Sequence, residues 1–100
     1  MSHIFLQRNG TLTASTGVAS VTLNFGDGIL MQLYVKAATG TTTFDISLTD
    51  INSIKVYDET DIVGTLNDTS QLPLYNNVTL AIANASVDEA FTYLIVVKER

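Results

Sequence analysis

Residues 41–61, TTTFDISLTDINSIKVYDETD, decide the fold class of this chain. Over residues 43–49 apolar side chains alternate with polar ones, and this period of two places successive side chains on opposite faces of a β-strand. The next four residues, DINS at 50–53, favour a tight turn, because Asp and Asn side chains hydrogen-bond to the backbone of a turn. Apolar residues resume over 54–57. The stretch therefore predicts a β-hairpin.

The same alternation recurs along most of the chain. The strands that it predicts are 3–7, 11–15, 18–25, 29–38, 43–49, 54–57, 78–83 and 91–98. The pair Asn9-Gly10 predicts a tight type I′ turn between the first two strands, whereas residues 58–72 predict an irregular loop. Seven to eight short strands predict an all-β fold, a small antiparallel β-sandwich with jelly-roll-like or Greek-key topology.

The candidate core consists of the apolar residues on one face of each predicted strand. These residues are Val18, Leu23, Phe25, Ile29, Met31, Leu33, Val35, Ala37, Phe44, Ile46, Leu48, Val78, Leu80 and Ile82. The strand at 91–98 differs from the others, because both of its faces are apolar at the centre. We therefore expect it to lie in the middle of a sheet, covered on both sides, with another subunit as the second cover.

Length and composition limit the range of functions. One hundred residues correspond to a single domain, 1–100, in which residues 1–10 form an N-terminal arm. The net charge is −5 and the five basic residues are scattered singly, which argues against nucleic-acid binding. The chain has no cysteine and no signal-peptide pattern at its start, so we expect synthesis in a cytoplasm. No apolar run approaches the ~18 residues that span a bilayer, so we expect no membrane association.

The sequence displays no motif that carries catalysis. His3 has no partner nearby in the sequence, and the GDG run at 26–28 lacks the lysine of a phosphate-binding loop. Asp58, Glu59 and Asp61 are the candidate metal ligands, since calcium prefers oxygen ligands. The run lacks the glycine and the distant glutamate of an EF-hand, so a solvated loop is the better interpretation. We expect no enzyme activity and no cofactor.

Two stretches, TTTFDISLTDINSIKVYDE (41–59) and NNVTLAIANASVDEAFTYLIVVKE (76–99), resemble a known group of proteins. They resemble the small all-β virion structural proteins of tailed bacteriophages, some of which are capsid decoration or cement proteins. The resemblance implies a decoration protein that binds and stabilises the lattice of the major capsid protein. It also implies a homo-oligomer, with a trimer as the expected form, on the capsid surface of the virion after synthesis in the host bacterial cytoplasm. It transfers no functional residue.

The candidate contacts with other virion proteins are Ile4, Phe5, Tyr93, Leu94 and Val96. A tail, head-fibre or head-tail connector protein of the virion is one alternative, which the sequence does not separate from decoration. A carbohydrate-binding or adhesion module is an alternative from another class, because tyrosine offers an apolar ring with a polar tip. Its candidate residues are Tyr34, Tyr57, Tyr75, Tyr93 and the acidic run at 58–61.

Overall fold

The computed structural model describes residues 5–74 and 77–99, and these form nine strands without a helix. The strands are β1 (Phe5–Ala14), β2 (Ala19–Asn24), β3 (Gly28–Ala37), β4 (Thr43–Thr49), β5 (Lys55–Val63), β6 (Thr65–Asp68), β7 (Leu72–Leu74), β8 (Asn77–Ala83) and β9 (Glu89–Glu99). Every pairing between them is antiparallel. The prediction of an all-β fold is confirmed.

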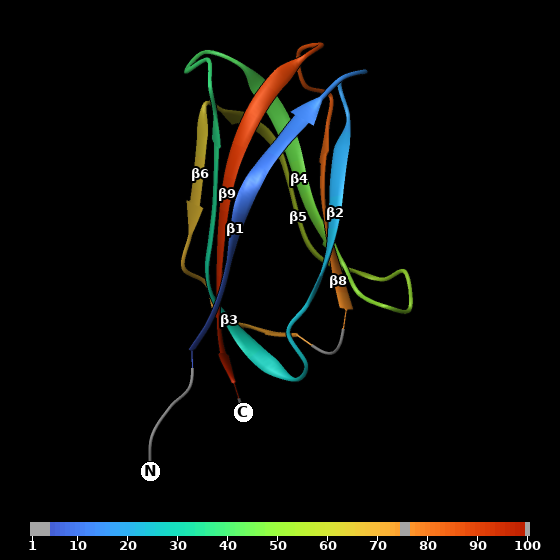
Figure 1. Cartoon of the computed structure of the whole chain (residues 1–100), viewed down its shortest axis with the longest axis vertical. Coiled ribbons are helices and arrows are strands. Elements are labelled where there is room, and N and C mark those ends of the chain that lie inside the picture. Colours follow the sequence, from blue (N-terminus) through green and yellow to red (C-terminus); the bar gives the residue numbers. More distant parts are fainter. Residues whose placement is uncertain (1–4, 75–76, 100) are drawn as a thin grey trace.

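The strands build two sheets that pack face to face (Figure 1). Sheet A has the order β1-β9-β3-β6, with β7 also paired to β3, and sheet B has the order β2-β8-β4-β5. β6 and β7 pair with separate parts of β3, so they act as one interrupted edge strand. The pairs β1/β9, β2/β8, β3/β6-β7 and β4/β5 are then nested within one another along the chain. Nested antiparallel pairs shared between two sheets are the jelly-roll topology, so the predicted sandwich is confirmed.

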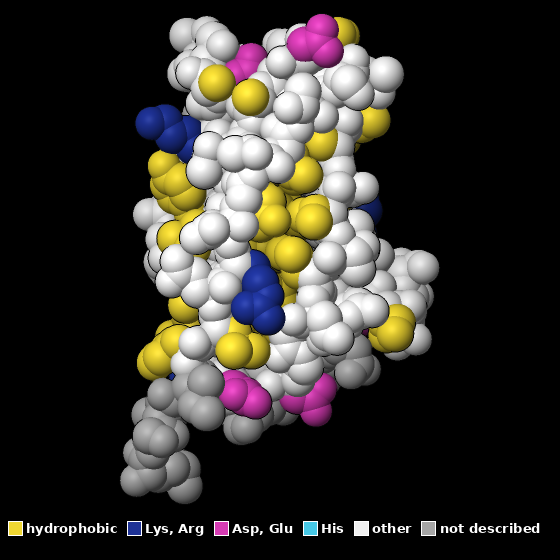
Figure 2. Space-filling model, viewed as in Figure 1, with side chains coloured by type: hydrophobic (Ala, Val, Ile, Leu, Met, Phe, Trp, Pro, Cys, Tyr) yellow, Lys and Arg dark blue, Asp and Glu magenta, His cyan; other side chains and the backbone are white. Residues whose placement is uncertain are grey.

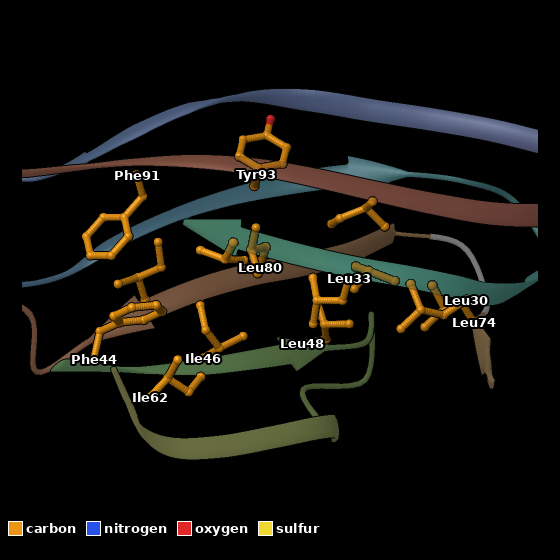
Figure 3. Close-up of a cluster of buried hydrophobic side chains, with 14 of the residues drawn as sticks. Leu30, Leu33, Phe44, Ile46, Leu48, Ile62, Leu74, Leu80, Phe91 and Tyr93 are labelled. Carbon is orange, nitrogen blue, oxygen red and sulfur yellow. The ribbon is translucent and has the colours of Figure 1, made fainter. Parts of the chain in front are cut away.

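The core fills the space between the sheets (Figure 3). Phe44 of β4 and Phe91 of β9 meet edge to face, with ring centroids 4.9 Å apart. The alternation predicted for β4 and β8 is confirmed, since Phe44, Ile46, Leu48, Val78, Leu80 and Ile82 are all buried. Each such side chain contributes roughly 1.5–3 kcal/mol by leaving water. These side chains of sheet B form one half of the core between the two sheets.

β1 is one continuous strand, so the predicted hairpin at Asn9-Gly10 is wrong. It pairs with β9 along its whole length, and Gly10 lies opposite Tyr93. A Cβ atom on residue 10 would lie 2.9 Å from the Tyr93 hydroxyl oxygen. In Figure 3 the Tyr93 hydroxyl points towards β1. The glycine therefore makes room for an aromatic ring, which local turn chemistry alone does not reveal.

Two other errors have local causes. A bulge in β3 between Leu30 and Gln32 shifts the alternation, so Leu30 is buried while Ile29 and Met31, both predicted for the core, are only partly buried. Val18 precedes β2 and is 53% exposed, so it too was wrongly predicted as core. One irregularity in a strand is enough to invert the assignment of every residue before it.

β9 lies between β1 and β3, which confirms its predicted place inside a sheet. Phe91, Ile95 and Val97 of β9 face the core, whereas Leu94 and Val96 face outwards and are partly buried. Residues 5–10, the described part of the expected N-terminal arm, belong to β1 and pair with β9. The outward residues of β9 therefore lie on a sheet surface that also includes this segment.

Candidate functional site

The outer surface of sheet A, here called the A face, brings together residues from three strands. The strand register sets them in rows across β1, β9 and β3. The rows are Phe5–Lys98–Ile29, Gln7–Val96–Gln32, Asn9–Leu94–Tyr34 and Thr11–Thr92–Lys36. The two central rows carry no charged side chain, and their apolar members lie in the middle strands. Such a surface is polar at its edge and apolar at its centre, which is the usual anatomy of a protein interface.

A shallow depression of about 450 Å³ lies on this face. It is lined by Gln7, Asn9, Gly10, Thr11, Tyr34, Thr92, Tyr93 and Leu94. None of these residues is charged. A depression of this kind accommodates a neutral polar or apolar group, because a charged group would lose hydration without gaining a partner.

The predicted contact residues do not all lie together. Phe5, which is 55% exposed, shares the A face with the partly buried Leu94 and Val96. Tyr93 faces the core with 6% of its surface exposed, and Ile4 lies outside the described residues. The A face therefore unites three of the candidates, and it adds Tyr34, which the sequence did not connect with Leu94.

One side of the sandwich is open between β1 and β2. Each of these strands has a single partner among the described residues, so both have an unpaired edge. Figure 1 shows that β1 and β2 meet at the top of the view and diverge below. Apolar side chains follow this gap in Figure 2, and a basic side chain lies across its lower part. Leu6 and Leu12 of β1 and Val21 and Leu23 of β2 remain partly exposed at the core's border.

Arg8 is the single charged residue of β1 and β2. Its guanidinium carbon lies 5.7 Å from the centroid of the Phe25 ring, just beyond the end of β2. This distance is within the range of a cation–π interaction, which is worth roughly 0.5–1 kcal/mol at an exposed site. The contact spans the open side near the end where β1 and β2 diverge.

The opposite side of the sandwich is closed by a hydrogen bond between the sheets. The Tyr57 hydroxyl of β5 donates to the Asp68 carboxylate of β6 over 2.9 Å. Burial and this hydrogen bond raise the pKa of Tyr57. The backbone N–H and the hydroxyl of Ser70, which both donate to Asp68, hold the pKa of that carboxyl below its usual value. Asp68 therefore stays ionised and accepts bonds from both neighbours.

Asp45 of β4 connects β5 and the turn after β8 at the outer surface of sheet B. Its carboxylate accepts hydrogen bonds from the Asp61 backbone N–H over 3.0 Å and from the Asn84 side-chain amide. These bonds hold the pKa of Asp45 below its usual value. Asp61 and Asn84 have φ angles of 57° and 54°, in the left-handed region that few non-glycine residues adopt. The sequence showed Asp45 only as an outward strand position and gave no sign of this structural role.

The acidic run at 58–61 lies in a strand and not in a loop, so the predicted loop is wrong. β5 continues to Val63, with a bulge opposite β4 near Asp61. Asp58 lies opposite Ser47, and Glu59 lies opposite the buried Ile46, so these neighbours point to opposite faces. In residues 5–74 and 77–99, no group of three or more His, Cys, Asp or Glu residues is arranged to hold a metal ion. The described part of the chain also has no helix long and apolar enough to cross a membrane.

No protein-family model matches the sequence, and no curated protein matches it. Among solved structures, the chain is similar to PliG of Aeromonas hydrophila, a periplasmic inhibitor of g-type lysozyme, with 13% identity and a TM-score of 0.48 over 95% of this chain and 86% of that one. It is also similar to a chain of the virus-like particle of extra small virus from the prawn Macrobrachium rosenbergii, with 13% identity and a TM-score of 0.34 over 97% and 80%.

A third similar structure comes from infectious bursal disease virus, strain Gx, with 9% identity and a TM-score of 0.37 over 99% of this chain and 32% of that one. The structural neighbours thus include proteins of virus particles. At these identities and scores the similarities do not assign a function, and the topology stands on the strand pairings given above.

Proposed function

We propose that the protein is a virion structural protein of a tailed bacteriophage, which decorates the capsid and stabilises the lattice of the major capsid protein. The A face is the observation that carries the proposal. Its central rows are uncharged in a chain with a net charge of −5. An uncharged, partly apolar area of surface is a typical feature of protein-binding sites. The resemblance of residues 41–59 and 76–99 to phage virion proteins supplies the class of partner.

The sheet is a suitable platform for such binding. Leu94 and Val96 lie on β9, which is held by β1 on one side and β3 on the other. Side chains on a doubly paired strand lose little conformational freedom when a partner covers them, so more of the interaction energy remains for affinity. Phe5 lies at the border of the face and is 55% exposed, so it has apolar surface left to bury.

Binding of the purified protein to phage capsids that lack it would test the proposal. Leu94→Asp places a charge at the centre of the A face, and we expect capsid binding to fall at least tenfold, because a buried charge without a partner costs several kcal/mol. Ser20→Asp is the matched control, since Ser20 is exposed on β2 of the other sheet. Thermal melting must first show that both variants fold.

Capsid binding and the heat stability of the particles decide whether the proposal is correct. We expect the wild type and Ser20→Asp to bind and to raise the temperature at which capsids release DNA. The proposal is wrong if the wild type does not bind capsids and particles lacking it withstand heat as well as complete ones. Copy number separates the other virion roles, since hundreds of copies per particle favour decoration and about a dozen or fewer favour a tail or connector position.

A carbohydrate-binding role is the second candidate, and the depression beside Tyr34 and Leu94 is the observation that favours it. Tyr34 supplies an aromatic ring, while Asn9 and Gln7 supply amides that can hydrogen-bond to sugar hydroxyls. A glycan array measured in calcium and then in chelator tests this function. Binding that is lost in Tyr34→Ala would support it, and the absence of binding in both conditions would remove it.

A further inference from the structure

The edges of the two sheets differ in how they are protected against pairing with another chain. On the closed side, β5 carries Asp58, Glu59 and Asp61 and contains a bulge. The other edge there is interrupted, because β6 has four residues and β7 has three, including Pro73. Charges, bulges, proline and short strands are the features by which natural proteins prevent edge pairing.

The open side has only one of these features, the single charge of Arg8, whose guanidinium lies over the Phe25 ring. β1 is ten residues long, keeps one register with β9 throughout, and has neither proline nor an acidic residue. β2 has six residues and no charge. Both strands leave apolar side chains partly exposed along the gap between them, as Figure 2 shows. An unprotected edge beside exposed apolar side chains is a site for strand addition.

We propose that β1 pairs antiparallel with β1 of a second copy of this chain, with Asn9 opposite Asn9 at the twofold axis. In this register the outward residue Gln7 lies opposite Thr11 of the second copy. Leu6 and Leu12 are spaced equally about Asn9, and both point inwards and are partly buried. Each Leu6 therefore lies opposite Leu12 of the second copy, so the exposed leucines cover one another. Twofold pairing of identical surfaces is the commonest form of protein assembly.

Neighbouring registers would oppose the side chains of the two β1 strands less favourably. A twofold axis at Arg8 would oppose two arginines directly, and like charges in opposed positions destabilise a sheet. An axis at Gly10 would put Leu6 opposite Ala14 and Arg8 opposite Leu12, so the leucines would not meet. The axis at Asn9 puts Arg8 opposite Gly10, which has no side chain, and each guanidinium keeps its place over Phe25 of its own chain.

The charge distribution also favours this side. The chain has a net charge of −5, so two copies repel each other in most orientations. β1 and β2 contain no acidic residue and one basic residue, so contact along β1 keeps the acidic residues of β5 on the far sides of both copies. The inference goes beyond the proposed function, because it concerns self-association and does not require a capsid.

Cysteine cross-linking provides a sharp test, since the chain has no cysteine of its own. Opposed Cα atoms in antiparallel strands are roughly 4.5–5.5 Å apart, within the range that a disulfide bridges. Asn9→Cys should therefore form a disulfide-linked dimer under mild oxidation. Thr13→Cys is the matched control on the same strand and face. Its two copies would lie eight residues apart along the strand, or about 27 Å, and should stay unlinked.

Sedimentation of the wild type completes the experiment. We expect a dimer mass, together with rapid cross-linking of Asn9→Cys and none of Thr13→Cys. A monomer or a trimer, the latter being the form implied by the resemblance, would overturn the proposal. A dimer in which Asn9→Cys does not cross-link, or in which Thr13→Cys links equally fast, would also overturn it. Capsid binding is measured separately, so failure of self-association and failure of the proposed function remain distinguishable.

Discussion

Removal of the Tyr57 hydroxyl should loosen the contact between the sheets on the closed side. In Tyr57→Phe the ring stays and only the hydrogen bond to the Asp68 carboxylate is lost. A hydrogen bond to a charged group contributes roughly 1.5–3 kcal/mol, and partial exposure of both groups reduces this by screening. We expect a loss of about 1–1.5 kcal/mol in the free energy of unfolding at pH 7. For a domain of this size that corresponds to a fall of roughly 4–12 °C in Tm.

The loss should depend on pH in a defined direction. The pKa of Asp68 is lowered in the folded protein, so the stability that its ionised form contributes is present above the unfolded pKa, about 4, and is lost as the pH falls through the folded value. The difference between wild type and Tyr57→Phe should therefore shrink below about pH 4. Urea denaturation at pH 7 and at pH 3 measures both differences.

A matched control and a double-mutant cycle make the test decisive. Tyr34→Phe removes a hydroxyl that makes no hydrogen bond to another described side chain, and it should leave the stability unchanged. Asp68→Ala combined with Tyr57→Phe should cost less than the sum of the two single changes, because both remove the same bond. Strict additivity, or an equal loss at both pH values, would refute the cross-sheet role of this bond.

Three further changes have expected outcomes in thermal or urea unfolding. Leu48→Ala should lower the free energy of unfolding by about 2–5 kcal/mol, because Leu48 is fully buried. Gly10→Ala should cost about 1–3 kcal/mol, since the new methyl group pushes the Tyr93 hydroxyl aside, while Asn9→Ala beside it should be nearly neutral. Asp45→Asn should lower Tm at pH 7. It should also make Tm fall less steeply as the pH is lowered, because the variant lacks the carboxyl group whose lowered pKa makes the stability depend on pH.

The parts of the fold that the sequence predicted well are those in which alternation is uninterrupted. β4 was predicted with its observed bounds, since a polar residue separates each apolar one from residue 43 to residue 49. The sequence predicts that β5 ends at residue 57, because charged residues such as Asp58, Glu59 and Asp61 are typical of loops. An edge strand, however, tolerates charges on its exposed side. The sequence assigns Asn9-Gly10 to a turn, because the packing of Gly10 against Tyr93 involves a residue 83 positions further along the chain (93 − 10 = 83).

The candidate site could be predicted only in part. The outward orientation of Leu94 and Val96 follows from the alternation of side chains along one strand, which can be seen in the sequence. The row that joins Asn9, Leu94 and Tyr34 depends on strand order and register, and the bulge in β3 alters both. The structural role of Asp45 depends on the backbone of Asp61 and the side chain of Asn84, which lie on two other segments. Such long-range pairings are set by tertiary packing and have no local signature.

The pairing of β1 with β9 has a practical consequence for handling the protein. Phe5 at the start of β1 lies opposite Lys98 near the end of β9, and Figure 1 shows the start of β1 and the end of β9 at the same pole. At the other pole, the Ala85 N–H of the turn at 84–88 donates to the Gly17 carbonyl of the turn at 15–18, and the turn at 38–42 donates to Glu89 and Ala90 at the start of β9. A fluorescent protein or affinity tag joined by a linker before β1 or after β9 therefore leaves the sandwich from one pole. Fusions at the two ends would report distances from that same pole in microscopy of an assembled particle.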